Sequence, residues 1–126
     1  MTTRIPAAQL REWEVRLSWP AQPLWQNRRV SWRKRAESVR IARTEAWAVA
    51  KKAKLPRLPT AILTFAFYPP DNRRRDIQNM PATMKAAIDG IADAMGCDDT
   101  GFRCVFPTTF SHIAPGGGVV IQIREV

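Results

Sequence analysis

Histidine and cysteine are scarce in this chain, and their scarcity excludes several kinds of site. The 126 residues include one histidine, His112, and two cysteines, Cys97 and Cys104. Zinc fingers, histidine-based metallonucleases and Ser-His-Asp hydrolases need histidine in defined roles or in number, so the chain is compatible with none of them. Any catalysis must therefore use carboxylates and a metal ion. We expect His112 in a strand, with a structural or surface role, and we predict no disulfide.

Long hydrophobic runs are also missing. The longest mostly apolar stretch, 61–70, is far too short to cross a bilayer, and no basic amphipathic helix carries a bulky apolar face. The chain begins without an apolar signal segment. We therefore expect no membrane partner, and a reducing cytoplasm is the simplest compartment.

Acidic residues are sparse in the first part of the chain and concentrated later. Up to Arg57 there are fourteen Lys and Arg against four Glu, and beyond it six against seven acidic residues. All six aspartates lie between Asp71 and Asp99, although the whole chain carries a net charge of +9. A basic platform followed by a carboxylate cluster suits a protein that binds a polyanion by its phosphates and places cations beside one of them.

The pattern of elements predicts one α+β domain spanning 1–126, with a mixed sheet and two main helices. Residues 1–10 read as a loose arm, and 24–34 as a basic, aromatic loop. Period-two alternation, or a dense apolar run, predicts strands over 13–19, 62–68, 102–106 and 119–126. Helical spacing predicts helices over about 35–54 and from about 80 to Gly96. Residues at steps of four, four, three and four give the second helix one apolar stripe: Met80, Met84, Ile88, Ile91 and Met95. The order is β-α-β-α-β-β, and we expect the last two strands to form a hairpin.

Three short motifs follow one another in the second half of the chain. They are Arg73-Arg74-Arg75-Asp76-Ile77-Gln78-Asn79, Lys85-Ala86-Ala87-Ile88-Asp89-Gly90 and Cys97-Asp98-Asp99. Together they resemble the RusA family of Holliday-junction resolvases, in which an Arg-rich strand end meets Asp-x-Asp-Asn, a lysine opens the next helix and an Asp-Asp pair follows it. The resemblance extends more weakly to Leu17-Ser18-Trp19-Pro20. Motifs of this family are widespread in phages and prophages.

The carboxylates suggest a magnesium site. Asp76 follows a strand and Asp99 follows the next helix, so we expect the two to return to one edge of the sheet and share an ion, with Asp98 and Gln78 as further ligands. Mg²⁺ prefers hard oxygen ligands and keeps several waters, and Mn²⁺ is expected to substitute. Such an ion lowers the pKa of a bound water, which provides a nucleophile without histidine. The alternative interpretation of Asp98 and Asp99 is a solvated turn.

By the resemblance, Lys85 is the catalytic lysine that neutralises charge on the phosphate in the transition state. The alternative is an exposed ion pair with Asp89, one helical turn later. We expect Asp89 and Asn79 to position the lysine and the metal ligands without binding the ion themselves.

Arginines and tryptophans indicate how DNA would bind. Arg73, Arg74 and Arg75 either clamp phosphates or form a surface charge run, and their position before Asp76 favours the clamp. The basic loop adds Arg28, Arg29 and Lys34. Trp25 and Trp32 either stack on bases exposed at a distorted junction or cover a core edge or a subunit contact.

The leading hypothesis is a homodimeric, Mg²⁺-dependent endonuclease that resolves four-way DNA junctions in recombination and repair. Symmetric cutting of two strands requires two equivalent sites, and the resembled family is dimeric. Two departures from the family pattern are Gln78, which replaces an acid, and three extra residues before Lys85. A junction-binding protein with weakened or lost cleavage is therefore the alternative. A basic RNA-binding or ribosome-associated domain is a second rival.

Overall fold

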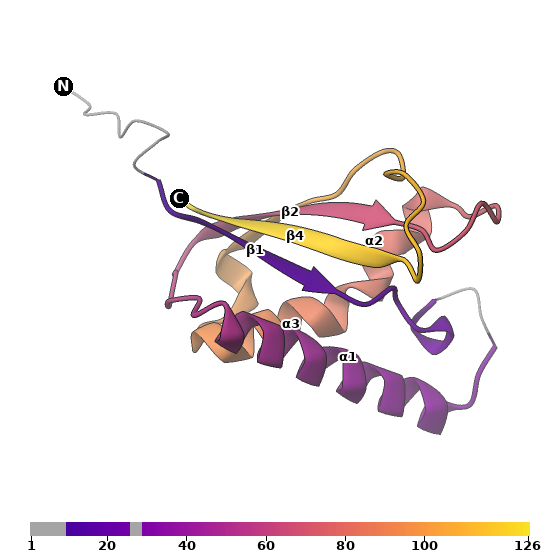
Figure 1. Ribbon diagram of the computed structural model, residues 1–126. Helices are drawn as coiled ribbons and strands as arrows, with labels where there is room; N and C mark the ends of the chain where they lie inside the picture. The colour runs from indigo at the N-terminus through magenta and orange to yellow at the C-terminus, as the bar shows by residue number, and fades with distance from the viewer. Residues whose placement is uncertain (1–9, 26–28) are drawn as a thin grey trace.

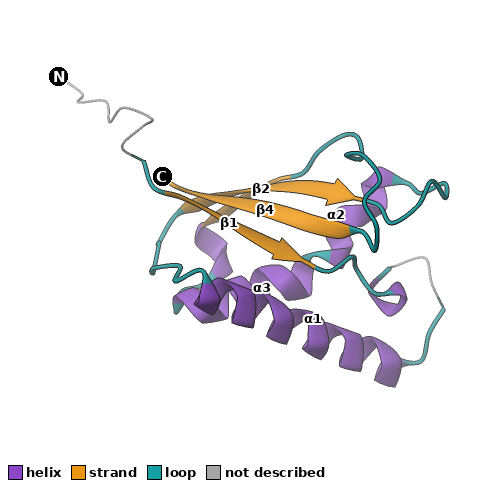
Figure 2. Ribbon diagram, in the orientation of Figure 1, coloured by secondary structure: helices purple, strands orange, loops and turns teal. Residues whose placement is uncertain are grey.

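The computed structural model describes residues 10–25 and 29–126, which form a four-stranded mixed sheet with helices packed on its buried face (Figures 1 and 2). This is the α+β architecture predicted from the order of elements. Of the expected arm at 1–10, only Leu10 lies within the described residues. The strands are β1 (Glu12–Leu17), β2 (Ala61–Tyr68), β3 (Phe102–Val105) and β4 (Gly118–Glu125); the helices are α1 (Trp32–Lys52), α2 (Met80–Thr83) and α3 (Lys85–Met95).

The sheet has the strand order β1-β4-β2-β3. β4 pairs antiparallel with β1 and with β2, whereas β3 pairs parallel with β2. The expected hairpin between the last two strands is wrong, because β2 lies between them. Parallel strands need a crossover connection, which α2 and α3 supply between β2 and β3.

The segment 106–117 explains why no hairpin forms. It passes the carboxyl end of β2, where the Ser111 amide donates to the Phe67 carbonyl at 2.9 Å and the Ala114 amide to the Pro69 carbonyl at 3.0 Å. His112 belongs to this connection and not to a strand, so that expectation is also wrong. Its ring is exposed and meets the Tyr68 ring edge-on, with centroids 5.0 Å apart.

One face of the sheet forms the core, as the period-two alternation predicts. Alternate residues of β2 are buried, and β4 and β1 add their own inward-facing residues. These are Ala61, Leu63, Phe65, Phe67, Val119, Ile121, Ile123, Val15 and Leu17. Against them pack the apolar side chains expected at steps of three and four on the second helix, all buried: Met80, Met84, Ile88, Ile91 and Met95.

Helix α1 begins earlier than periodicity indicates. The hydroxyl of Ser31 accepts from the Lys34 amide at 3.2 Å, an N-cap that starts the helix at Trp32. Lys34 therefore belongs to the first turn of α1 and not to a loop. In the chain outside 1–9 and 26–28, no helix is long and apolar enough to span a membrane.

The second predicted helix is divided into α2 and α3, and a short 3-10 helix, η3 (Ile77–Asn79), precedes it. The break falls at Met84, whose φ of −94° and ψ of −6° depart from helical values. α3 then runs to a left-handed C-cap at Gly96, with φ 70°, as expected from the glycine. The division matters because it makes Lys85 the first residue of its own helix.

Helices α1 and α3 approach each other closely at Gly90. A Cβ atom at this position would overlap the backbone carbonyl oxygen of Arg43, and it would lie 3.1 Å from the Cβ of Ala46. The side chain of Arg43 also reaches α3, donating to both carboxylate oxygens of Asp93 at 2.6 and 3.0 Å. The contact fixes the position of α3, and with it Lys85, relative to α1.

Gly90→Ala should destabilise the fold, although Ala is the better helix former by about 0.8–1.0 kcal/mol. The added methyl meets backbone, which cannot rotate away, so we expect the free energy of unfolding to fall by about 2 kcal/mol in urea denaturation. Gly96→Ala is the control: nothing lies within 4 Å of its Cβ position, and only its φ of +70° is strained. A more stable Gly90→Ala variant would contradict the close approach.

Candidate functional site

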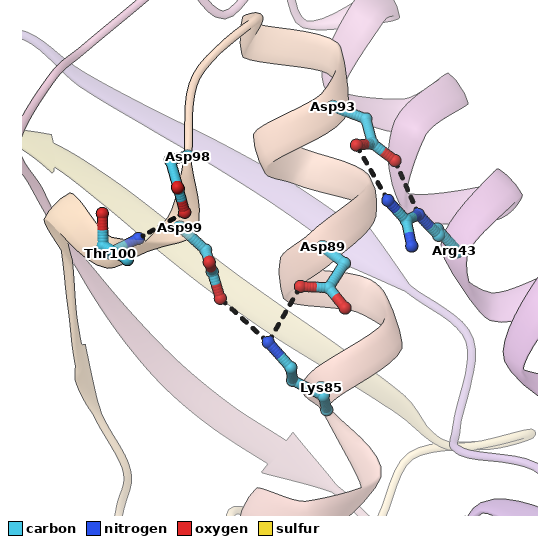
Figure 3. A network of polar contacts seen from close by, with 7 residues as sticks. All are labelled: Arg43, Lys85, Asp89, Asp93, Asp98, Asp99 and Thr100. Atoms are coloured by element: carbon cyan, nitrogen blue, oxygen red, sulfur yellow. Dashed lines mark hydrogen bonds and ion pairs between the residues drawn. The ribbon is translucent and has the colours of Figure 1, made fainter.

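Lys85 joins two carboxylates from different parts of the chain (Figure 3). Its Nζ donates to Asp89 Oδ1 at 3.0 Å and to Asp99 Oδ2 at 2.9 Å. The Lys85 side chain remains 68% exposed, against 26% for Asp89 and 31% for Asp99. We name Lys85, Asp89, Asp98 and Asp99 the lysine–carboxylate cluster. Both the sequence-derived pair with Asp89 and a contact with Asp99 are present.

The contacts stabilise the charged form of each partner. The hydrogen bond to Asp99, and then that to Asp89, raises the pKa of Lys85 above its ordinary value. The hydrogen bond from Lys85 holds the pKa of Asp99 below its ordinary value. Lys85 is therefore an ammonium and Asp99 a carboxylate at neutral pH.

Asp98 and Asp99 occupy the start of a 3-10 helix, η4 (Asp99–Gly101). Asp98 caps it by accepting from the Thr100 amide at 3.1 Å, and Asp99 is the first residue of the helix. Gly101 lets η4 lie directly against the chain before β2, since a Cβ there would overlap the Pro59 carbonyl oxygen. The predicted turn exists, and close backbone packing holds its acids in place.

A pocket of about 360 Å³ borders these acids. Asp89 and the Asp98–Asp99 pair line it together with Arg43 and Asp93. Because Arg43 and Asp93 bond each other through two hydrogen bonds, they are engaged in joining α1 to α3. The acids left for chemistry are those of the lysine–carboxylate cluster.

The arginine run borders a second pocket, of about 460 Å³, which we name the arginine–tryptophan pocket. Its lining combines basic, acidic, amide and aromatic side chains from the segment after β1 and the segment after β2. The members used below are Trp19, Trp25, Arg73, Arg74, Arg75, Asp76 and Asn79.

The three arginines have different surroundings. Arg75 is mostly buried, with 12% of its side chain exposed, and its Nη2 donates to Asp71 Oδ1 at 2.8 Å. Its Nη1 donates to the backbone carbonyls of Asp71 and Arg73, both at 3.1 Å, and its guanidinium lies 5.4 Å from the Trp19 ring centroid. Arg75 thus supports the pocket wall. Arg73 and Arg74 are exposed.

Asp76 caps η3, accepting from the Gln78 amide at 2.9 Å. Asp76 and Gln78 are exposed, and Asn79 is half-buried at the rim of the arginine–tryptophan pocket. The amide side chain of Gln78 does not line this pocket. Asp76 thus faces the arginines while Gln78 lies outside.

The other residues expected to bind DNA are spread along the segment before and within α1. Arg29, Lys34 and Trp32 are exposed, with Trp32 75% so. Arg28 lies outside the described residues. Trp25 is half-buried against the core edge. Neither alternative offered for the two tryptophans is excluded by these positions.

Asp76 and Asp99 border different pockets. Asp76 comes after the carboxyl end of β2, whereas Asp99 comes before the amino end of β3, and these two strands are parallel with Ala61 opposite Phe102. The expectation that the two return to one edge of the sheet is wrong, because the chain passes from the carboxyl end of one parallel strand to the amino end of the next. Their sharing of an ion stays a prediction. The structure itself assembles Lys85, Asp89, Asp98 and Asp99.

The donor set suits a cation held with few protein ligands. Over 10–25 and 29–126, no three His, Cys, Asp or Glu side chains are arranged to hold a metal ion. Magnesium, however, is commonly bound through one or two carboxylates, waters and substrate phosphates. The adjacent carboxyls of Asp98 and Asp99, which border one pocket, fit that mode.

Sequence reasoning missed Trp19 and Asp71 as parts of a site. Trp19 continues the alternation of the first strand and was therefore expected in that strand, but β1 ends at Leu17. The signal available was Pro20, which ends a strand and turns the chain. Asp71 precedes Arg75 by four residues, a spacing that carries no meaning outside a helix.

Comparison with known proteins gives a relative but no activity. No family model matches the chain. The chain is 38% identical over 115 residues to an uncharacterized protein of Xylella fastidiosa (strain Temecula1 / ATCC 700964), a match that covers 87% of this chain and 74% of the relative. The resemblance to the RusA family stays a prediction. At this identity and coverage, the chain belongs to the same family as the uncharacterized Xylella fastidiosa protein.

Proposed function

We propose that the protein is a Mg²⁺-dependent, structure-specific endodeoxyribonuclease that cuts branched DNA, chiefly four-way junctions. The observation that carries the proposal is Lys85, held between Asp89 and Asp99 beside a third aspartate, Asp98. This grouping matches the lysine and the Asp-Asp pair of the resembled family, brought together from the start of α3 and the start of η4.

Lys85 suits the stabilisation of a phosphate. An ammonium has three N–H donors, and two of them are directed at Asp89 and Asp99. The third is free to meet a phosphate oxygen, because most of the side chain is exposed. The two carboxylates fix the ammonium before the substrate arrives, so little reorganisation is needed when charge develops on the phosphate.

Asp98 and Asp99 are the residues that would hold the ion. When bound there, Mg²⁺ would supply a water of lowered pKa and polarise the scissile phosphate. The remaining acid, Asp89, positions Lys85. Histidine is not needed for any of these roles.

DNA binding is supported by charge and by exposed arginines. The net charge of +9 favours a polyanionic partner, and Arg73 and Arg74 present guanidinium groups that match phosphate oxygens. Arg29, shortly before α1, and Lys34, in its first turn, add two exposed cations. A homodimer follows from the substrate, since symmetric cuts need two equivalent sites.

A second candidate function is junction binding without cleavage. Gln78 favours it, because an amide supplies no charge where the resembled family has an acid. The exposed arginines serve binding equally well in this case. Cleavage assays distinguish the two functions directly.

Asp99→Asn should abolish cleavage of a labelled four-way junction in Mg²⁺ and leave junction binding intact or tighter, since it removes a ligand and also a repulsion from phosphate. We expect the same of Asp76→Asn if Asp76 completes the ion site. Asp93→Asn is the matched control, because Asp93 borders the same pocket as Asp99 but bonds Arg43. Undiminished cleavage by Asp99→Asn would refute the site, and no cleavage by the natural protein would favour the binding function.

Lys85→Met should lower the cleavage rate by about 10²–10³-fold, the usual loss on removing one preorganised donor. Junction affinity should change little, because a single cation contributes modestly beside the basic surface. Single-turnover cleavage and a gel-shift titration measure the two effects. Lys52→Met, an exposed lysine in the last turn of α1, controls for net charge. Equal losses in both variants would contradict a specific role.

Gln78→Asp restores the acid expected from the family pattern. If a ligand is missing, this variant should reach half-maximal cleavage at a lower Mg²⁺ concentration, because an added carboxylate strengthens cation binding. Gln78→Asn is the uncharged control of similar chemistry. An unchanged Mg²⁺ dependence would mean that another group already occupies the position of the missing ligand.

A further inference from the structure

We propose that the arginine–tryptophan pocket receives one unstacked nucleotide of the DNA branch point, with its base on the Trp25 ring and its phosphate on Arg73 and Arg74. The inference rests on the proposed function and adds the part of the substrate that this pocket would take. Three observations support it: the volume of the pocket, the different contacts of its two tryptophan rings, and the exposure of Arg73 and Arg74 beside the engaged Arg75.

The pocket is larger than a phosphate requires. Its volume of about 460 Å³ lies within the roughly 300–1,000 Å³ typical of sites that enclose small organic ligands. Its lining contains the rings of Trp19 and Trp25 and a polar set in which three arginines outnumber two aspartates. A nucleotide has the same division, with a flat base at one end and an anion at the other.

The two rings are placed differently. Trp19 contacts Trp25, Phe110 and the Arg75 guanidinium, at 6.2, 6.3 and 5.4 Å between centres, so it forms the wall. Trp25 is tilted by 42° to Trp19, and the two rings therefore do not stack on each other. The Trp25 indole N–H donates to the Pro20 carbonyl at 3.4 Å, which restrains the ring. Trp25 is thus the ring available as a stacking platform.

The wall behind the rings is rigid. Gly117 has φ 69°, and its Cβ position lies 2.9 Å from Pro70 Cδ and 3.1 Å from Trp19 Cβ, so backbone packs directly on both. Arg75 is held by Asp71 on the other side. A preformed pocket loses less entropy on binding than one that must be assembled.

The polar side has open donors. In the part of the chain that the structure describes, the Arg74 guanidinium makes no side-chain ion pair, and Arg73 is exposed beside it. Guanidinium groups bind phosphate oxygens through paired hydrogen bonds. The Asn79 amide, with one acceptor and two donors, lies on the same lining and can meet a base edge.

A nucleotide fits this lining better than an acidic peptide does. A peptide carboxylate would use the arginines but would leave the indole surface in contact with water. Drawing out a base costs least where pairing and stacking are already disturbed, as at a branch point distorted by a bound protein.

Trp25→Leu tests the inference, with Trp47→Leu, an exposed tryptophan on α1, as control. Both changes are made in the cleavage-deficient Asp99→Asn protein, and junctions carry 2-aminopurine at one branch-point position. We expect Trp25→Leu to weaken junction affinity about ten-fold and to leave linear-duplex affinity unchanged. It should also remove the change in 2-aminopurine fluorescence that occurs when the protein binds the junction. Trp25→Phe should restore most of the junction affinity and most of the fluorescence change. Unchanged junction affinity, or an equal loss on duplex, would overturn the inference.

A second measurement separates this inference from the nuclease proposal. Single-stranded oligothymidylate should quench tryptophan fluorescence of the natural protein, and Trp25→Leu should lose most of that quenching. Polyglutamate of equal charge should quench much less; equal quenching would assign the pocket to acidic peptides and overturn the inference. If Trp25→Leu cleaves and binds junctions normally, the pocket assignment is wrong and the nuclease proposal stands. If oligothymidylate quenches Trp25 fluorescence but the natural protein cleaves no junction, the nuclease proposal is wrong and the pocket assignment stands.

Discussion

The close contact between α1 and α3 is the constraint on which the rest of the site depends. The missing Cβ of Gly90 admits the Arg43 carbonyl, and the Arg43 side chain then reaches Asp93, less than one turn further along α3. The apolar side of α3 is turned into the core, so Lys85 and Asp89 are directed outward next to η4. Position and orientation of the lysine thus follow from packing that involves none of the reacting groups.

The cations of this chain divide into two classes. Arg43 and Arg75 each bond a carboxylate closely, and Arg75 is largely buried, which makes both parts of the framework. Arg73 and Arg74 remain exposed, and Lys85 combines the two properties because it is held by carboxylates yet open to solvent. A basic composition by itself predicts a polyanionic partner, but only the structure separates supporting cations from those open to bind it.

Local pattern predicted the elements well, and long-range pairing was the weak point. Alternation in β2 and the Met80 to Met95 stripe identified the buried faces, because burial follows directly from period. The hairpin failed because adjacency in sequence does not determine adjacency in a sheet, and the paired carboxylate Asp99 lies fourteen residues from Lys85, beyond any helical spacing. The arginine–tryptophan pocket joins two segments that are about fifty residues apart in the chain. Helix and strand periodicity relates only residues that are close in sequence, so it could not predict this pocket.

The separation of Asp76 from Asp99 assigns different demands to the two pockets. In the lysine–carboxylate cluster the Lys85 ammonium bonds Asp89 and Asp99, and Asp98 adds a third carboxyl group to the pocket that those two acids border, so acids outnumber the cation. In the arginine–tryptophan pocket cations outnumber acids, so it would attract the phosphates of a DNA strand. The lysine–carboxylate cluster would repel the same phosphates unless a cation were bound there. The segment Ile77–Thr83 links the two along the chain. In the proposed nuclease, Gln78 on that segment would weaken cation binding, because an amide adds no charge, and would ease the approach of a phosphate for the same reason.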